Sequence, residues 1–297
     1  MRTALAFVLL LVCAPAVAAL NVFACEPEWA ALAHELGAGD VSTVSATTAF
    51  QDPHRIEARP SLIARLRNAD LVVCSGSQLE AGWLPVLLSQ AGNGRVQPGT
   101  PGYLEAAPLV ERLDVPQTVD RSQGDVHPGG NPHIHTDPRN IAKVSAVLAE
   151  RLAELDRNHA QDYRRRAADF GARWQAAIVR WEAEAAPLKG ASVIQHHKTF
   201  SYLARWLGLR ELDTLEPKPG IPPTTQHLVE LVERLKREPA RMILYSSYDD
   251  PRAAQFLAQR GGIPAVMLPL TVGGSDRAKD LYGYFDDLIA RLVGAAK

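Results

Sequence analysis

The feature that most restricts the fold is a long helical segment in the middle of the chain, between two halves in which strand and helix signals alternate. Residues 159–186 contain no proline. Their large side chains recur at helical spacing on one face, at Tyr163, Ala167, Phe170, Trp174, Ile178 and Trp181. A continuous helix of this length is stiff, so we expect it to join two lobes as a rigid connector rather than as a loose linker.

Short apolar runs typical of buried parallel strands lie on both sides of this segment. The predicted strands are 20–25, 69–76, a short one near 107–110, 191–197, 240–247 and 264–270. The predicted helices are 60–68, one after residue 76, one beginning at Asp137-Pro138, 199–209, 227–237, 250–261 and 276–292. This alternation predicts an α/β fold with parallel sheets flanked by helices. We expect lobes at 20–155 and 187–297, joined by a connecting helix at 156–186.

The first 18 residues have the layout of a secretory signal peptide. One arginine precedes an apolar run from residue 4 to residue 12, and the small residues 16–18 form a cleavage site. Lipidation at Cys13 is the alternative, although the bulky Val12 before it disfavours that processing. No later segment is apolar for long enough to cross a bilayer, so we expect a soluble, exported protein.

Charge and cysteine content exclude some functions and suggest one covalent bond. The 32 basic and 33 acidic residues nearly balance and form no basic stripe, so we expect no nucleic-acid partner. Cys25 and Cys74 survive signal removal, and each closes a strand-like run. Adjacent parallel strands would place them side by side, so we predict a disulfide in an oxidising compartment. Two buried thiols remain the alternative, because sequence does not give their separation.

Three histidines stand in short turn-like segments beside predicted strands or helices. His54, His133 and His197 are about 80 and 64 residues apart. Neutral imidazole is a common ligand for a divalent metal, and three imidazoles with one further donor make a tetrahedral zinc site. Ligands this far apart meet only if separate lobes bring them together. The spacing therefore predicts a metal held between lobes for capture and release.

A catalytic metal is the competing interpretation of three histidines. The chain contains no H-E-x-x-H, no G-x-S-x-G and no phosphate-binding Gly-Lys-Ser/Thr motif. A catalytic zinc also needs a general base, and the histidine segments offer none. We therefore expect a binding protein rather than an enzyme, with a metal-dependent hydrolase and a surface adhesin as the alternatives.

Several local motifs, taken in order, resemble one family. They are DPH at 52–54 with Pro60-Ser61 after it, ADLVVCSGSQLEAGWL, NPHIHTDP, HKTFSY and LEPKPGIPPTTQHLVELV. Together they resemble the zinc- and manganese-specific periplasmic binding proteins of ABC transporters, of the ZnuA/TroA type. The resemblance covers nearly the whole mature chain.

The resemblance implies a periplasmic protein that passes metal to the membrane permease of an ABC transporter. It selects His54, His133 and His197 as ligands. A nitrogen-rich set favours Zn(II) over manganese, although affinity alone would also permit Cu(II) or Ni(II). A zinc metallochaperone as a second partner and a monomeric state are further expectations.

The other histidines near these motifs are expected to play lesser roles. His135 falls where the family usually has tryptophan, so we expect it to pack beside the ligands or to be solvated. His196 adjoins His197 on a strand and must point to the opposite face. His127 lies in a Gly-rich loop and is expected to be solvated there; the alternative is a loop that handles metal transiently, as the longer His-rich loops of relatives do.

The fourth ligand departs from the family pattern. Relatives usually place an aspartate where this chain has Leu268. Among nearby carboxylates we favour Asp280, because Gly273-Gly274 would let the loop return to the cleft. Asp276 is the alternative, and the pair Asp249–Asp250 or a water molecule is the remaining choice.

Overall fold

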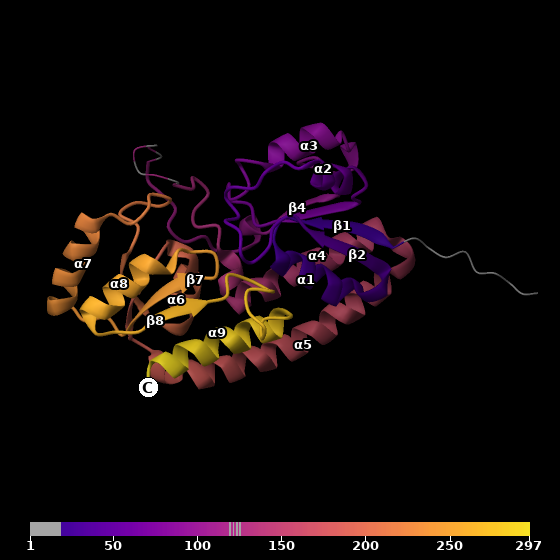
Figure 1. Ribbon diagram of the computed structural model, residues 1–297. Coiled ribbons are helices and arrows are strands. Elements are labelled where there is room, and N and C mark those ends of the chain that lie inside the picture. The colour runs from indigo at the N-terminus through magenta and orange to yellow at the C-terminus, as the bar shows by residue number, and fades with distance from the viewer. Residues whose placement is uncertain (1–18, 119, 121, 123, 125) are drawn as a thin grey trace, which may run out of the picture.

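The computed structural model describes residues 19–118, 120, 122, 124 and 126–297 and folds them into two lobes (Figure 1). The first lobe contains the parallel strands β1 (Leu20–Ala24), β2 (Val41–Ser45), β3 (Leu71–Cys74) and β4 (Tyr103–Glu105), in the order β2-β1-β3-β4. The second contains β5 (Ser192–Gln195), β6 (Arg210–Thr214), β7 (Met242–Ser246) and β8 (Ala265–Leu268), in the order β6-β5-β7-β8. The predicted α/β class is confirmed, and both sheets have the same topology.

Alternate residues of the first sheet face two helical layers, because successive side chains of a strand point to opposite sides. Val22 and Val73 pack on the side of α1 (Pro27–Gly37) and α4 (Pro138–Leu155). Phe23 and Val72 pack on the other side, against α2 (Pro60–Arg67) and α3 (Leu84–Ala91). Both faces of this sheet are therefore covered, as expected for a parallel sheet.

The second sheet is covered in the same way. Ile194 and Ile243 pack with α7 (Thr225–Arg237) and α8 (Pro251–Gly261). Val193 and Met242 face the opposite side, with α6 (Ser201–Leu207) and α9 (Leu281–Ala295).

Helix α5 (Ala160–Ala185) runs along one edge of the molecule beside α9 and contacts both lobes (Figure 1). The indole of Trp174 donates to the carbonyl of Pro138 in the first lobe, and that of Trp181 donates to Asp286 in the second. The apolar face of α5 belongs to one continuous core that includes strand residues of both sheets. A shared core makes the connection rigid. The lobe boundaries given above remain a prediction.

The sequence-based assignment missed or misplaced some elements, mostly at sheet edges. β2 and β6 were not predicted, because both are edge strands with polar residues and partial exposure. The strand expected near 107–110 lies at Tyr103–Glu105 instead. Residues Ala107–Leu109 form a 3-10 turn, in which Pro108 has no N–H to offer a sheet.

Cys25 and Cys74 form a disulfide, which confirms that prediction. Strands β1 and β3 are parallel neighbours with Ala24 opposite Val73. Their carboxyl ends therefore place the two cysteines side by side, with Cα atoms 4.8 Å apart.

Candidate metal centre

His54 lies in the loop between β2 and α2 with its ring fixed by a carboxylate. Its Nδ1 lies 2.7 Å from Oδ1 of Asp52, which also accepts the backbone N–H of His54. This contact places the proton on Nδ1 and leaves the lone pair of Nε2 outward. Burial alone would raise the pKa of Asp52. The hydrogen bonds from His54 stabilise the carboxylate more, so the pKa lies below its usual value. The indole of Trp83 donates to the carbonyl of Pro53 and holds this loop.

His133 precedes a 3-10 turn at the start of α4, and its side chain is enclosed. The residue is 1% exposed, and the side chain of Asn131 accepts its backbone N–H. Neither ring nitrogen has a hydrogen-bond partner among the described residues. Burial lowers the pKa of His133 well below its usual value, so the ring is neutral near pH 7.

His197 follows β5 and comes from the second lobe. Its Nδ1 lies 2.7 Å from Oε2 of Glu216, which also accepts the N–H of Gly220. Although burial disfavours the charged ring, the hydrogen bond and charge of Glu216 raise the pKa of His197.

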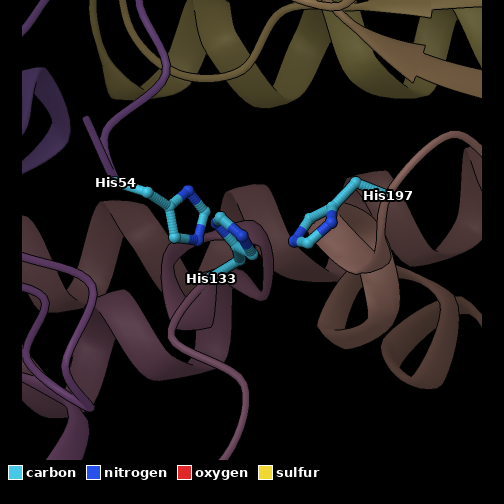
Figure 2. Close-up of side chains that lie close together, drawn as sticks. All are labelled: His54, His133 and His197. Atoms are coloured by element: carbon cyan, nitrogen blue, oxygen red, sulfur yellow. The ribbon is translucent and has the colours of Figure 1, made fainter. Parts of the chain in front are cut away.

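The fold brings the three rings together from both lobes, and they point toward one another (Figure 2). One nitrogen from each ring lies within 4.8 Å of the others. Ring centroids are 5.5–5.7 Å apart, with interplanar angles of 68°, 80° and 87°. Three converging nitrogens can hold a divalent cation, while the rings of His54 and His197 are oriented by carboxylates on their far nitrogens.

A fourth imidazole, that of His127, lies at this cluster, contrary to the expectation of a solvated loop residue. Its Nε2 is 3.1 Å from Nε2 of His54, and the ring centroids are 5.1 Å apart. His127, His133 and His197 line one cavity of about 250 Å³. The sequence signal was a single histidine six residues before His133, too weak to separate it from a solvated one.

Asp280 and Asp276 lie outside the group formed by His54, His133 and His197, contrary to the placement expected for a fourth ligand. Both side chains are exposed. Oδ1 of Asp280 caps α9 by accepting the N–H of Gly283 at 2.7 Å. Its carboxylate borders a different cavity, beside His34 and Arg173. The loop folds back on itself, because the N–H of Gly273 donates to the carbonyl of Ala278.

The remaining candidates also have other contacts. Asp250 caps α8 and pairs with Arg252, and Asp249 accepts the N–H and hydroxyl of Ser246. His135 is 3% exposed, so it is packed rather than solvated, which was one of the two expectations for this residue. Its ring bridges Oε1 of Glu28 and the carbonyl of Leu270 at 3.0 Å each.

His196 is buried and lines a separate cavity with Glu216 and Phe256. The opposite orientations of His196 and His197 follow from their adjacent places at the end of β5.

Fold and site together define a two-lobed binding protein with a histidine cluster between its lobes. The family model for the periplasmic component A of the zinc-uptake complex matches residues 22–295, and the chain belongs to this family. It is a substrate-binding component of a metal transporter that works with an ABC permease, not an enzyme, which confirms those predictions.

Individual relatives are distant in sequence and close in fold. The chain is 21% identical over 240 residues to the high-affinity zinc uptake system protein ZnuA of Bacillus subtilis, covering 79% of this chain and 73% of the relative. It is 23% identical over 233 residues to the zinc-binding lipoprotein AdcA of Streptococcus pneumoniae, covering 78% of this chain but 46% of AdcA. A crystal structure of ZnuA superposes with a TM-score of 0.79 at 20% identity, covering 94% of this chain and all of the other.

Relatives are periplasmic proteins or lipoproteins, in agreement with export. The predicted signal peptide, including Cys13, lies outside the described residues. Within the described part of the chain, no helix has the length and apolar character needed to span a membrane.

Proposed function

We propose that the protein binds one Zn(II) in the periplasm through His54, His133 and His197 and delivers it to the permease of an ABC transporter for import. The family match supports metal capture and transport. The convergence of three imidazoles from two lobes supports these residues as the ligands. A signal peptide at residues 1–18, a monomeric state and loading by a metallochaperone belong to the same proposal.

The single observation that carries the proposal is the state of the His133 ring. Both nitrogens are enclosed and lack a hydrogen-bond partner among the described residues. A buried polar group without a partner costs about 1–3 kcal/mol, so such groups are rare unless a ligand satisfies them. A metal ion coordinated by one nitrogen would remove part of this cost.

The donor chemistry favours zinc over manganese. Zinc prefers nitrogen ligands in a tetrahedral arrangement, whereas harder ions prefer carboxylate and water oxygens. The nearby carboxylates of Asp52 and Glu216 are already bound to the far nitrogens of His54 and His197. They therefore orient the imidazoles instead of binding the metal.

His127 is the best candidate for the fourth donor. Two nitrogens bound at about 2.0–2.1 Å in a tetrahedral site are roughly 3.3 Å apart. Nε2 of His127 and Nε2 of His54 are 3.1 Å apart, close to that edge length. The segment carrying His127 is attached to both lobes, since Lys218 donates to the carbonyl of Ser122 and Ser77 donates to that of Gly129.

The shared core along α5 restricts lobe movement, so we propose that capture involves side-chain and loop adjustment rather than wide hinge closure. Neither a hydrolase nor an adhesin is supported by a feature of this site.

Calorimetric titration of the metal-free protein tests the proposal. Zn(II) should bind at one tight site, and Mn(II) and Fe(II) should bind far more weakly. These two ions are the relevant comparators, because a relative from Yersinia pestis is named iron-binding and a structural neighbour was solved with manganese. Tighter binding of Mn(II) than of Zn(II) would reject zinc as the cargo.

A further inference from the structure

Two buried glutamates, Glu26 and Glu80, interact with each other in the first lobe, in the segments that follow β1 and β3. They are 3% and 4% exposed. Oε2 of Glu26 accepts the N–H and the hydroxyl of Ser75 at 3.1 and 3.0 Å. Both oxygens of Glu80 accept the N–H of Gly76 at 3.1 and 3.2 Å. Oε1 of Glu26 is sealed from solvent and meets no donor in the described part of the chain.

No positive group compensates these two carboxyls. Among the described residues, no ion pair includes either of them. The titratable groups that face them are Glu28 on α1, paired with His135, and Tyr103 and Glu105 on β4. None of these neighbours is a lysine or an arginine, and the His135 ring lies against Glu28, with Nδ1 3.0 Å from Oε1. Two ionised carboxylates in one dry site repel each other strongly, so such a pair normally retains a proton.

The unpartnered oxygen shows where that proton lies. An Oε1–H on Glu26 directed at the Glu80 carboxylate would satisfy both groups. Burial, with the charges of Glu80 and Glu28, raises the pKa of Glu26 well above its usual value. Burial raises the pKa of Glu80 to about 7.

The Glu80 carboxyl closes a turn that supports the metal centre. Residues Gly76, Ser77 and Gln78 have φ angles of 77°, 51° and 67°, a left-handed conformation that costs energy in non-glycine residues. The bond from Gly76 N–H to Glu80 spans this region. From the same turn, Ser77 binds the segment that carries His127, and Trp83 binds the loop that carries His54.

We propose that Glu26 and Glu80 share one proton in the folded protein, and that this proton holds the turn at residues 76–83 against the segments carrying His54 and His127. Glu80 is thus a positioning residue, not a ligand. The effect of this turn on zinc binding rests on the proposed function. The shared proton is independent of that function.

Titration of the metal-free protein tests the shared proton directly. In protein carrying carboxyl-¹³C-labelled glutamate, NMR should show at least one glutamate that titrates far above the others. This signal should disappear in Glu26→Gln and in Glu80→Gln and persist in Glu154→Gln, an exposed control on α4. If every glutamate titrates in its ordinary range, or if both variants retain the high signal, the proposal is wrong.

Stability against pH gives a second readout that does not depend on zinc. Between the pKa of an unfolded glutamate and that of the pair, the folded state binds more protons, so stability falls as pH rises. Glu26→Gln carries a permanent N–H donor in place of the shared proton. Its urea midpoint should therefore fall less than that of the wild type between pH 5 and pH 8. An equal fall in both proteins would overturn the proposal.

The zinc measurement separates this proposal from the proposed function. Glu80→Ala should weaken zinc binding, and Glu26→Gln should preserve it. If the wild type bound no zinc but the high titration remained, the proposed function would fail and the shared proton would stand. Unchanged zinc binding in a folded Glu80→Ala would remove the positioning role.

Discussion

The two lobes have the same strand order but contribute differently to the metal centre. The first lobe provides His54, His133 and His127, and burial lowers the pKa of His133. Within the described residues, the second lobe contributes His197 to this cluster, and the pKa of that ring is raised by Glu216. Repetition of a topology therefore does not repeat the chemistry, because the proposed ligands lie on loops beyond the strands. The difference implies that the first lobe offers a neutral ring at His133, whereas metal competes with a proton at His197 up to a higher pH than at an ordinary histidine.

The largest expected effect comes from removing one ligand from each lobe. If structural zinc binding of about 10–16 kcal/mol is divided among four donors, each contributes roughly 2.5–4 kcal/mol. His133→Ala and His197→Ala should each weaken zinc binding by a factor of roughly 70 to 900. Calorimetry, with His34→Ala on the exposed face of α1 as control, measures this loss.

The pH dependence of the residual affinity sharpens the comparison. His133→Ala retains His197, so its binding should still weaken as pH falls through the raised pKa of that ring. In His197→Ala this acid-side loss should shrink. Tight binding that persists in both variants would mean that neither His133 nor His197 is a ligand.

Only the first lobe carries a disulfide, and its removal should have an effect of comparable size, on stability rather than on zinc binding. The bond closes a loop with a sequence separation of 49 residues. A loop of that length corresponds to about 4 kcal/mol of stabilisation. A Cys25→Ala/Cys74→Ala double variant should lose about this much in guanidinium unfolding. Reductant should destabilise the wild type but not the variant, and free-thiol labelling of both cysteines in exported wild-type protein would contradict the bond.

Removing the carboxylate of Glu216 should have a smaller effect, confined to the second lobe. Substitution of a group that orients a ligand typically costs 10–100-fold in metal affinity, and we expect this range for Glu216→Gln. The variant should also lower the pKa of His197, so its zinc binding should resist acid better. Titration at several pH values, with the exposed Glu111→Gln as control, measures both changes.

The metal-free protein should show the corresponding change in stability. A raised folded-state pKa of His197 means that its contribution is fully present below the unfolded value of about 6.5 and is lost as pH rises through the folded value. The wild type should therefore exceed Glu216→Gln in urea midpoint most at acid pH. A difference that grew toward alkaline pH would contradict this assignment of charge.

The fold could be predicted from sequence wherever a buried strand or an amphipathic helix has a strong apolar pattern. The face of α5 that includes Phe170, Trp174 and Trp181 is buried as predicted. The edge strands β2 and β6 were not predicted, because their residues are mostly polar and half exposed. Their pairing depends on backbone contacts with β1 and β5, which a local pattern does not encode.

For the site, local motifs were enough to select His54, His133 and His197 as candidate ligands, because each lies in a recognisable turn beside a strand or helix. The fourth position was not predictable, since the direction of a loop side chain depends on distant contacts. His127 reaches the cluster through a segment held by Lys218 and Ser77, neither of which is near it in sequence. The loop with Gly273-Gly274 was expected to bring Asp280 to the cleft, but the Asp280 carboxylate instead accepts an N–H group from the first turn of α9.

The smallest expected effect comes from Asp280→Ala, which separates a capping role from a ligand role. Loss of an N-cap carboxylate costs about 1 kcal/mol of stability, so the urea midpoint should fall slightly. Zinc affinity should not change, because the carboxylate borders a different cavity and binds Gly283. His127→Ala is the matched comparison and should weaken zinc binding without loosening α9. The reverse result, with zinc binding lost in Asp280→Ala and retained in His127→Ala, would identify Asp280 of the second lobe as the fourth ligand. The loop that carries Asp280 would then have to open toward the cleft when metal binds.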